Sequence, residues 1–180
     1  MVGTLDWTPA LDRPDLLAAP VAAALSARPD DAPSVQVAEI DPTLADTAAF
    51  CETYGVPLDI SANCVVLAAK RSGGATGLAA CLVLATTRAD VNGLARRTLE
   101  ARKASFAAMD EAVAATGMEY GGITPIGLPP DWPLLVDAAV AASGQAVVGS
   151  GVRRSKLLLP GALLAALPGA QVLVGLGRVT

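Results

Sequence analysis

Apolar and polar residues alternate along Ser34–Ile40, which reads SVQVAEI. A period of two is typical of a strand with one buried face, so this segment predicts a half-buried β-strand. Two longer apolar runs, 61–70 and 77–87, flank the polar stretch RSGGAT at 71–76. This arrangement predicts a β-hairpin with a flexible loop, and the scarcity of polar residues in the runs predicts that both strands are mostly buried.

Helices are expected where apolar and polar residues mix and the segment starts at a capping residue or ends at a glycine. Residues 43–54 form one such run, and Gly55 follows where a left-handed residue would end the helix. A second helix is expected over 91–100, capped by the side chain of Asp90. A third, over 110–116, also ends at a glycine.

The remaining apolar runs are short and separated by breakers. They predict strands over 102–107, 133–137, 145–149, 154–158 and 171–177. The run GALLAAL after Pro160 predicts a helix, because proline is favoured at a helix start. Strands mixed with short helices in this order predict an α/β fold with a mixed, curved or barrel-like sheet and peripheral helices.

The N-terminal residues differ in character from the rest. Residues 1–33 are expected to form an appendage with a helix over 15–27, kinked at Pro20. The polar stretch RPDDAP then separates this appendage from the main domain, expected over 34–180.

The composition indicates one folded domain in the cytoplasm. The chain has 180 residues, 53% hydrophobic and 17% charged, which suits a single domain with a full core. No run reaches the ~18 apolar residues of a membrane helix. The N-terminus has acidic residues and prolines where a signal peptide is basic and then apolar. We therefore expect a cytoplasmic protein with no membrane partner.

The three cysteines, Cys51, Cys64 and Cys81, all have apolar neighbours and none belongs to a C-x-x-C pair. They are expected to be reduced and buried, as small hydrophobic residues. Cys64 and Cys81 stand at roughly mirror positions about the hairpin loop and are expected to be near neighbours across two strands.

The chain contains no histidine. A Ser-His-Asp or Cys-His triad therefore cannot be built, and three scattered cysteines are poor zinc ligands. No metal or other cofactor is expected. The net charge of −4 gives no overall attraction to nucleic acid, so DNA is not an expected partner and RNA would need a local basic patch.

The glycine-rich loop Gly121–Gly127, GGITPIG, is the strongest candidate for chemistry. Its glycines let another molecule approach the main chain closely, and successive free N–H groups can bind an anion or an oxyanion. It matches neither a Walker loop nor G-x-G-x-x-G. From the residues alone, a ligand loop and a structural turn are equally well supported.

The segment TGMEYGGITPIGLP at 116–129, preceded by RKASFA and MDEAVAAT, resembles the core of the YbaK/EbsC and prolyl-tRNA-synthetase-associated editing family. In that family a strand, a short helix ending in Thr-Gly and a G-G-x-x-P-x-G loop come in this order. LLVDAAV and VVGSGVRRSKLLLPGALLAAL downstream, and AAFCETYGVP upstream, resemble further family elements. The similarity covers roughly residues 35–177.

The resemblance implies hydrolysis, in trans, of the ester bond of mischarged aminoacyl-tRNA. The implied partners are the 3′ acceptor end of tRNA and prolyl-tRNA synthetase. The aminoacyl ester is labile and the ribose 2′-hydroxyl can orient water, so a preorganised oxyanion site and a shaped pocket would suffice. The implied catalytic residues are Asn63, Gly121 and Gly122. The candidate substrate-binding residues are Ile123, Thr124, Pro125, Gly127, Asp137, Gly149, Ser150 and Gly151. For some of them a structural role is also open: a backbone bond in the turn for Thr124, a loop cap for Asp137 and a hairpin bend for 149–151.

The sequence departs from the family at one position. Active members carry a lysine at the start of the strand that corresponds to 61–70, and here that position is Asn63, or Ala62 if the register shifts by one. An amide can orient a carbonyl or a water molecule, but it supplies no positive charge. Besides an active deacylase, the departure leaves open a catalytically impaired binding module, and the acidic composition leaves open a hydrolase of a small acyl ester.

Two basic clusters are candidates for contact with the acceptor stem, although each would also fit a solvated face. The tRNA-binding candidates are Arg96, Arg97, Arg102 and Lys103 in the first cluster and Arg153 and Arg154 in the second. The second cluster also includes Lys156, for which a solvated face and a contact with the acceptor stem are again the two interpretations.

Overall fold

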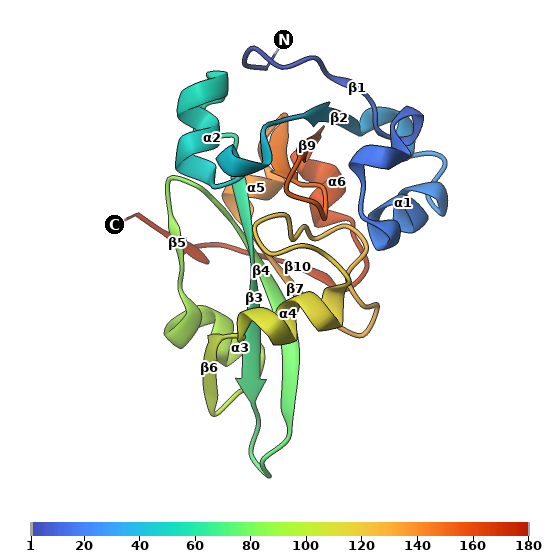
Figure 1. Cartoon of the computed structure of the whole chain (residues 1–180). Helices are drawn as coiled ribbons and strands as arrows, with labels where there is room; N and C mark the ends of the chain where they lie inside the picture. The colour runs from blue at the N-terminus through green and yellow to red at the C-terminus, as the bar shows by residue number, and fades with distance from the viewer. Residues whose placement is uncertain (1, 180) are drawn as a thin grey trace.

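The computed structural model describes residues 2–179, whose strands form three sheets (Figure 1). The five-stranded sheet has the order β10-β7-β4-β3-β6; β3, β4 and β6 pair antiparallel, whereas β4, β7 and β10 run parallel. Its strands are β3 (Ala62–Lys70), β4 (Thr76–Leu84), β6 (Lys103–Phe106), β7 (Leu134–Asp137) and β10 (Ala170–Leu173). The hairpin loop between β3 and β4 extends beyond the rest of the molecule (Figure 1).

The second sheet is antiparallel, with the order β1-β2-β9-β8. Its strands are β1 (Thr8–Pro9), β2 (Gln36–Glu39), β8 (Ala146–Gly149) and β9 (Ser155–Leu159), while β5 (Arg88–Ala89) and β11 (Gly177–Arg178) pair separately. The two larger sheets meet where Ser61 bridges Val147 in parallel and the Val147 N–H donates to Ile60 O over 2.7 Å. This junction produces the mixed, curved sheet that the sequence predicted.

The helices are short and lie at the periphery (Figure 1). They are α1 (Ala19–Ser26), α2 (Thr47–Tyr54), α3 (Arg96–Thr98), α4 (Met109–Thr116), α5 (Ala138–Ala141), α6 (Gly161–Ala165) and the π-helical turn η5 (Val91–Ala95). Four 3₁₀ turns complete them: η1 (Ala10–Asp12), η2 (Pro14–Leu16), η3 (Ala32–Ser34) and η4 (Pro42–Leu44). Gly55 and Gly117 end α2 and α4 with left-handed φ of 64° and 67°, as predicted.

Period-two alternation divides the buried residues between the two faces of β4. Ala80 and Leu82 face the main cluster with Val136, Val148 and Leu157, whereas Cys81 and Val83 face a second cluster beneath η5. Cys64 stands opposite Leu82, not opposite Cys81, and packs on the main cluster. The two residues are therefore near neighbours across the strands, as expected, but one register position apart, so that their side chains lie on opposite faces. Burial raises the pKa of the Cys64 thiol, and the nearby Cys81 adds to this shift. All three cysteines are free; Cys51 and Cys81 are buried and Cys64 is half-buried.

Residues of the N-terminal segment share the main core. Leu16, Val21 and Leu25 are at most 2% exposed and belong to the same cluster as Leu157. The helix begins at Ala19 and not at 15, so Pro20 occupies its first turn and causes no kink. The division at residue 33 into an appendage and an editing domain stays a prediction, because shared packing does not define a family boundary.

Across residues 2–179, no helix has both the length and the apolar character of a membrane-spanning segment.

Candidate functional site

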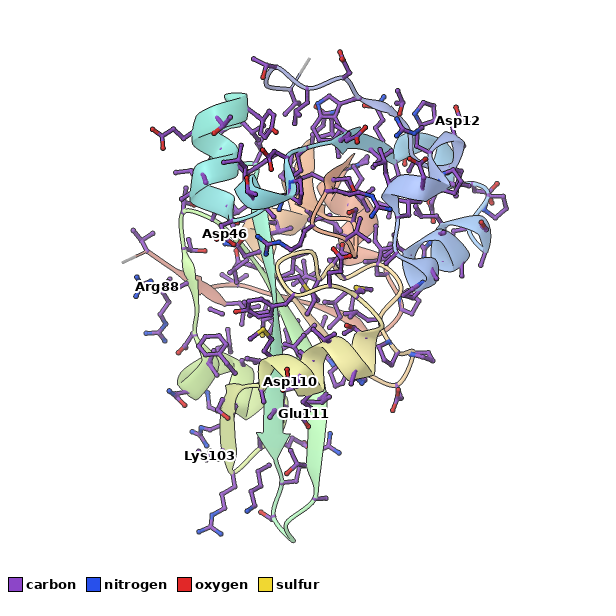
Figure 2. The ribbon with its side chains drawn as sticks, viewed as in Figure 1. Asp12, Asp46, Arg88, Lys103, Asp110 and Glu111 are labelled. Atoms are coloured by element: carbon purple, nitrogen blue, oxygen red, sulfur yellow. The ribbon has the colours of Figure 1, made fainter. Side chains whose placement is uncertain are left out.

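A cleft of about 370 Å³ opens between α2, the start of β3, α4, the 118–123 loop and the β8–β9 pair. Its lining brings together residues that are far apart in the chain: Asp46, Thr47, Asn63, Gly121, Gly149 and Lys156. Figure 2 shows Asp46 beside α2 at this part of the molecule. Among the predicted site residues, Asn63, Gly121, Ile123 and Gly149 line the cleft.

Asn63 enters the cleft from β3 and is fixed by a neighbour on α2. The Thr47 hydroxyl donates to Asn63 Oδ1 over 2.6 Å. Within residues 2–179 the amide NH₂ has no protein acceptor, so it remains available to an oxygen atom in the cleft.

Gly121 presents its backbone to the cleft. It has φ of 84°, a conformation that favours glycine, and no acceptor for its N–H occurs in the described part of the chain. The N–H of Gly122 instead donates to Glu119 O over 2.9 Å, and its carbonyl accepts from Gly151 N over 2.7 Å. The expectation that Gly122 offers a free donor is therefore wrong, because this glycine is tied into a turn.

Gly122 and Gly149 are glycines because two backbone segments approach each other here. A Cβ on Gly122 would lie 2.6 Å from Val152 C, and one on Gly149 would lie 2.8 Å from Ile123 O. The glycine loop is thus held against the β8–β9 connection, which fixes Gly121 at the cleft.

Lys156 was predicted as a member of an exposed basic cluster, and its place in the cleft was not predicted. It is 7% exposed and lines the cleft, so it does not belong to a solvated face. Its Nζ donates to Ala45 O over 2.8 Å and lies 5.2 Å from the centre of the Phe50 ring. Burial lowers the pKa of Lys156 from 10.5 to about 8; Cys51 and Asp46 partly offset this shift and Arg153 adds to it.

Several predicted substrate-binding residues lie outside this cleft. Pro125 and Gly127 line a separate apolar hollow beside α1, and a Cβ on Gly127 would lie 2.5 Å from Pro20 O. Thr124 is fully buried, and its hydroxyl has no partner in the described residues. The loop beyond Ile123 therefore turns away from the cleft.

Asp137, Ser150 and Gly151 have structural surroundings. Asp137 accepts from Ala139 N at the start of α5 over 2.9 Å and from Gly177 N over 2.7 Å. The Ser150 hydroxyl is fully buried and lies 2.7 Å from that of Ser155. Gly151 has φ of 87° and its N–H donates to Gly122 O.

The two basic clusters differ in structure. Arg153 links two backbone segments. Its guanidinium donates to Pro42 O over 3.1 and 3.2 Å and to Tyr120 O, next to Gly121, over 3.2 Å. Arg154 also donates to a backbone oxygen, that of Asp15. In the other cluster Arg96 donates to Asn92 O over 2.9 Å, whereas Arg97, Arg102 and Lys103 are exposed.

That exposed cluster continues onto the hairpin. Lys103 is paired directly with Lys70 across β6 and β3, and Arg71 follows Lys70 at the surface. Like charges directly opposite each other disfavour a strand pair, so this patch has a cost in stability. Figure 2 shows Lys103 well separated from Asp46, toward the hairpin end of the molecule.

Large apolar side chains are exposed at the mouth of the cleft. Phe106, Met109 and Tyr120 are 66%, 52% and 57% exposed, and all three line the cleft. The chain has only two phenylalanines and two tyrosines, so one of each at this rim is a marked concentration. No group of His, Cys, Asp and Glu side chains suited to a metal occurs in residues 2–179.

Comparison with known proteins assigns a family. The chain resembles the crystal structure of a candidate trans-editing enzyme for prolyl-tRNA synthetase (TM-score 0.72, 23% identity, 87% of this chain and 94% of that one). It also resembles a hypothetical protein (TM-score 0.73, 21% identity, 88% and 99%). No curated protein matches the sequence. The family model for the aminoacyl-tRNA editing domain matches residues 41–167, which is more than half of the chain. The chain therefore belongs to the aminoacyl-tRNA editing domain family.

Proposed function

We propose that this protein hydrolyses, in trans, the ester that links a wrong amino acid to the 3′ end of a tRNA. The observation that carries the proposal is the cleft, which Asn63 and Gly121 both line and whose Asn63 NH₂ and Gly121 N–H have no acceptor among residues 2–179. Membership in the editing-domain family supports the same chemistry.

In the proposed reaction, water adds to the ester carbonyl carbon and the carbonyl oxygen becomes an oxyanion. The bond from that carbon to the ribose oxygen then breaks. The ribose oxygen takes a proton, leaving a free tRNA 3′ end and the amino acid. The Gly121 N–H and the Asn63 NH₂ are donors for the oxyanion, and such donors accelerate acyl transfer because they are oriented before the reaction.

The cleft mouth offers a place for the terminal nucleotide. Unpaired bases stack on aromatic side chains, and Phe106 and Tyr120 are the exposed rings at this rim. β6 runs from Phe106 at the cleft to Lys103 in the basic patch, and its three residue steps span roughly 10 Å. An acceptor end whose last base stacks at the rim can therefore bring its preceding phosphates toward Arg102 and Lys103.

A second candidate function is a binding module that holds aminoacyl-tRNA without hydrolysing it. The amide of Asn63 in the cleft favours this alternative, because it adds no positive charge to stabilise the oxyanion.

A deacylation assay separates these functions. Purified protein is incubated with tRNA carrying alanyl, cysteinyl, seryl or threonyl esters, beginning with tRNA(Pro), and with a small activated acyl ester as a control. Release of amino acid above the protein-free rate supports editing. Hydrolysis of the small ester alone would assign another esterase function. Tight binding of aminoacyl-tRNA without hydrolysis would establish the binding module.

A further inference from the structure

Lys156 is a buried cation in the wall of the cleft. It is 7% exposed, and no carboxylate lies within ion-pair distance of its ammonium in the part of the chain that the structure describes. Its one hydrogen bond is to Ala45 O. A lysine ammonium has three N–H donors, so two are left without a protein acceptor.

The neighbouring strands leave room for the lysine side chain. In the register of the four-stranded sheet, Lys156 stands directly opposite Ala38 on one side and Gly149 on the other. Neither neighbour carries a side chain beyond Cβ, and side chains at paired positions share a face of the sheet. The aliphatic stem therefore lies over the sheet, and the ammonium reaches the space between Ala45 and the Phe50 ring.

A purely structural role is a poor account of this residue. Burial of an ammonium with no carboxylate in ion-pair distance costs free energy. One hydrogen bond, one aromatic ring and the more distant Asp46 offset only part of this cost. A neutral N–H or O–H donor could make the one hydrogen bond to Ala45 O, so this bond does not explain a charged residue. Lys156 destabilises the fold and lines a cleft, and a ligand with negative charge in that cleft would explain why a lysine is present there.

Resting on the proposed function, we infer that the Lys156 ammonium binds the carbonyl oxygen of the scissile ester and stabilises its negative charge as water adds. The aminoacyl group is the terminal part of the substrate, so it enters deepest, while the preceding nucleotide stays at the Phe106–Tyr120 rim. Lys156 supplies the positive charge that Asn63 cannot supply. It acts with the backbone of Gly121, a residue that lines the same cleft.

The test compares Lys156→Met with the wild-type protein and with Arg88→Met, which removes an exposed positive charge on β5, outside both the cleft and the basic patch. Met keeps the length of the stem and removes the charge. We expect a loss of about 100- to 1,000-fold in kcat for Lys156→Met, as for loss of an oxyanion donor. KM should change little, because the charge acts mainly in the transition state. Arg88→Met should hydrolyse substrate at the wild-type rate, and Lys156→Met should unfold at the same or a higher temperature.

Each outcome decides the inference. If the wild-type protein hydrolyses substrate and folded Lys156→Met stays within threefold of it, Lys156 has no catalytic role and the proposed function stands. If the wild-type protein hydrolyses nothing, the proposed function fails. The inference is then tested by the affinity for a phosphonate analogue of aminoacyl-adenosine, a non-hydrolysable probe whose anionic tetrahedral group mimics the oxyanion. Equal affinity of the two proteins would overturn it and a loss of at least tenfold would support the contact. Lys156→Gln serves in both assays if Lys156→Met does not fold.

Discussion

Lys156 and Asn63 are held by opposite ends of one three-residue segment, Ala45–Thr47. The carbonyl of Ala45 accepts from Lys156 Nζ over 2.8 Å, and the hydroxyl of Thr47 donates to Asn63 Oδ1 over 2.6 Å. The lysine is on β9 and the asparagine on β3, so this segment positions two groups from different sheets in one cleft. A change at Thr47 should therefore disturb the site without removing either group.

Thr47→Val should lower the deacylation rate by about tenfold. The hydroxyl that fixes the Asn63 amide is lost while the side-chain volume is kept, and a positioning contact is worth about 1–1.5 kcal/mol. Asn63→Ala should lower the rate by a similar factor. The double variant should show no further loss, because both changes disable the same donor, the Asn63 amide. Single-turnover kinetics of the three variants provide the measurement. Fully additive losses would show that Thr47 does not act through Asn63.

The stability of the protein should depend on pH through Lys156. Its pKa is about 8 in the folded protein and 10.5 as the ordinary value, because burial disfavours the charged form. Below pH 8 the lysine is charged in both the folded and the unfolded states, and the full cost of burying the charge is present. Between pH 8 and 10.5 the unfolded chain binds a proton that the folded protein does not, so this residue's contribution to stability rises with pH.

Thermal unfolding of wild-type protein and Lys156→Met across pH 6–11 tests this dependence. The advantage of Lys156→Met in unfolding temperature should be greatest below pH 8 and should narrow toward pH 10.5. Asp46, Cys51 and Arg153 face the same ammonium, and all three are present in both proteins. A difference in unfolding temperature that stays constant over this range would show that the Lys156 pKa is not lowered by folding.

Much of the fold was predictable from local signals. The hairpin of β3 and β4, the capping of η5 by Asp90 and the glycine ends of α2 and α4 depend on neighbouring residues, and each was predicted. The N-terminal helix was predicted four residues too long at its start, because Pro20 was taken for a kink instead of a first-turn residue. The register of Cys64 and Cys81 depends on the turn geometry of the hairpin, and the sequence does not determine it to one residue.

The candidate site was less predictable, because its contacts join distant segments. Lys156 follows two arginines, and this charge run favoured a solvated face. The signal against that interpretation was its position within the apolar strand SKLLL, where every residue is buried. Gly121 and Gly122 are equivalent in sequence, and only the backbone path shows that one faces the cleft while the other packs on Val152.

Substitution at these two glycines should separate activity from stability. A Cβ on Gly122 meets the backbone of Val152 at 2.6 Å, which cannot move aside cheaply, so Gly122→Ala should lower the unfolding temperature strongly. Gly121→Ala meets only the Arg153 side chain but strains a φ of 84°, at a cost of about 1 kcal/mol. It should remain folded and lose at least tenfold in rate. A folded, fully active Gly121→Ala would exclude the Gly121 backbone from the reaction.

The basic patch should contribute to tRNA binding through phosphate contacts. Arg102→Gln combined with Lys103→Gln should weaken binding and reduce the magnitude of the salt slope by about 1–2. Arg153→Gln is the comparison, because that guanidinium is occupied by Pro42 O and Tyr120 O. It should lower the unfolding temperature and leave the salt slope near that of the wild-type protein. The reverse pattern in filter-binding titrations at several salt concentrations would assign the phosphate contacts to Arg153.

The exposed rings at the cleft mouth should bind the terminal base. Tyr120→Ala and Phe106→Ala should each weaken binding of an aminoacyl-adenosine analogue by about fivefold to a hundredfold, since stacking of one base on an aromatic side chain contributes ~1–3 kcal/mol. Both side chains are more than half exposed, so their removal should leave the unfolding temperature almost unchanged. Leu58→Ala is the matched control, because Leu58 is a 46% exposed apolar residue outside the cleft lining. If both ring variants and the control bind the analogue equally well, the rim does not hold the base. The proposal that the last base stacks on Phe106 and Tyr120 would then be wrong.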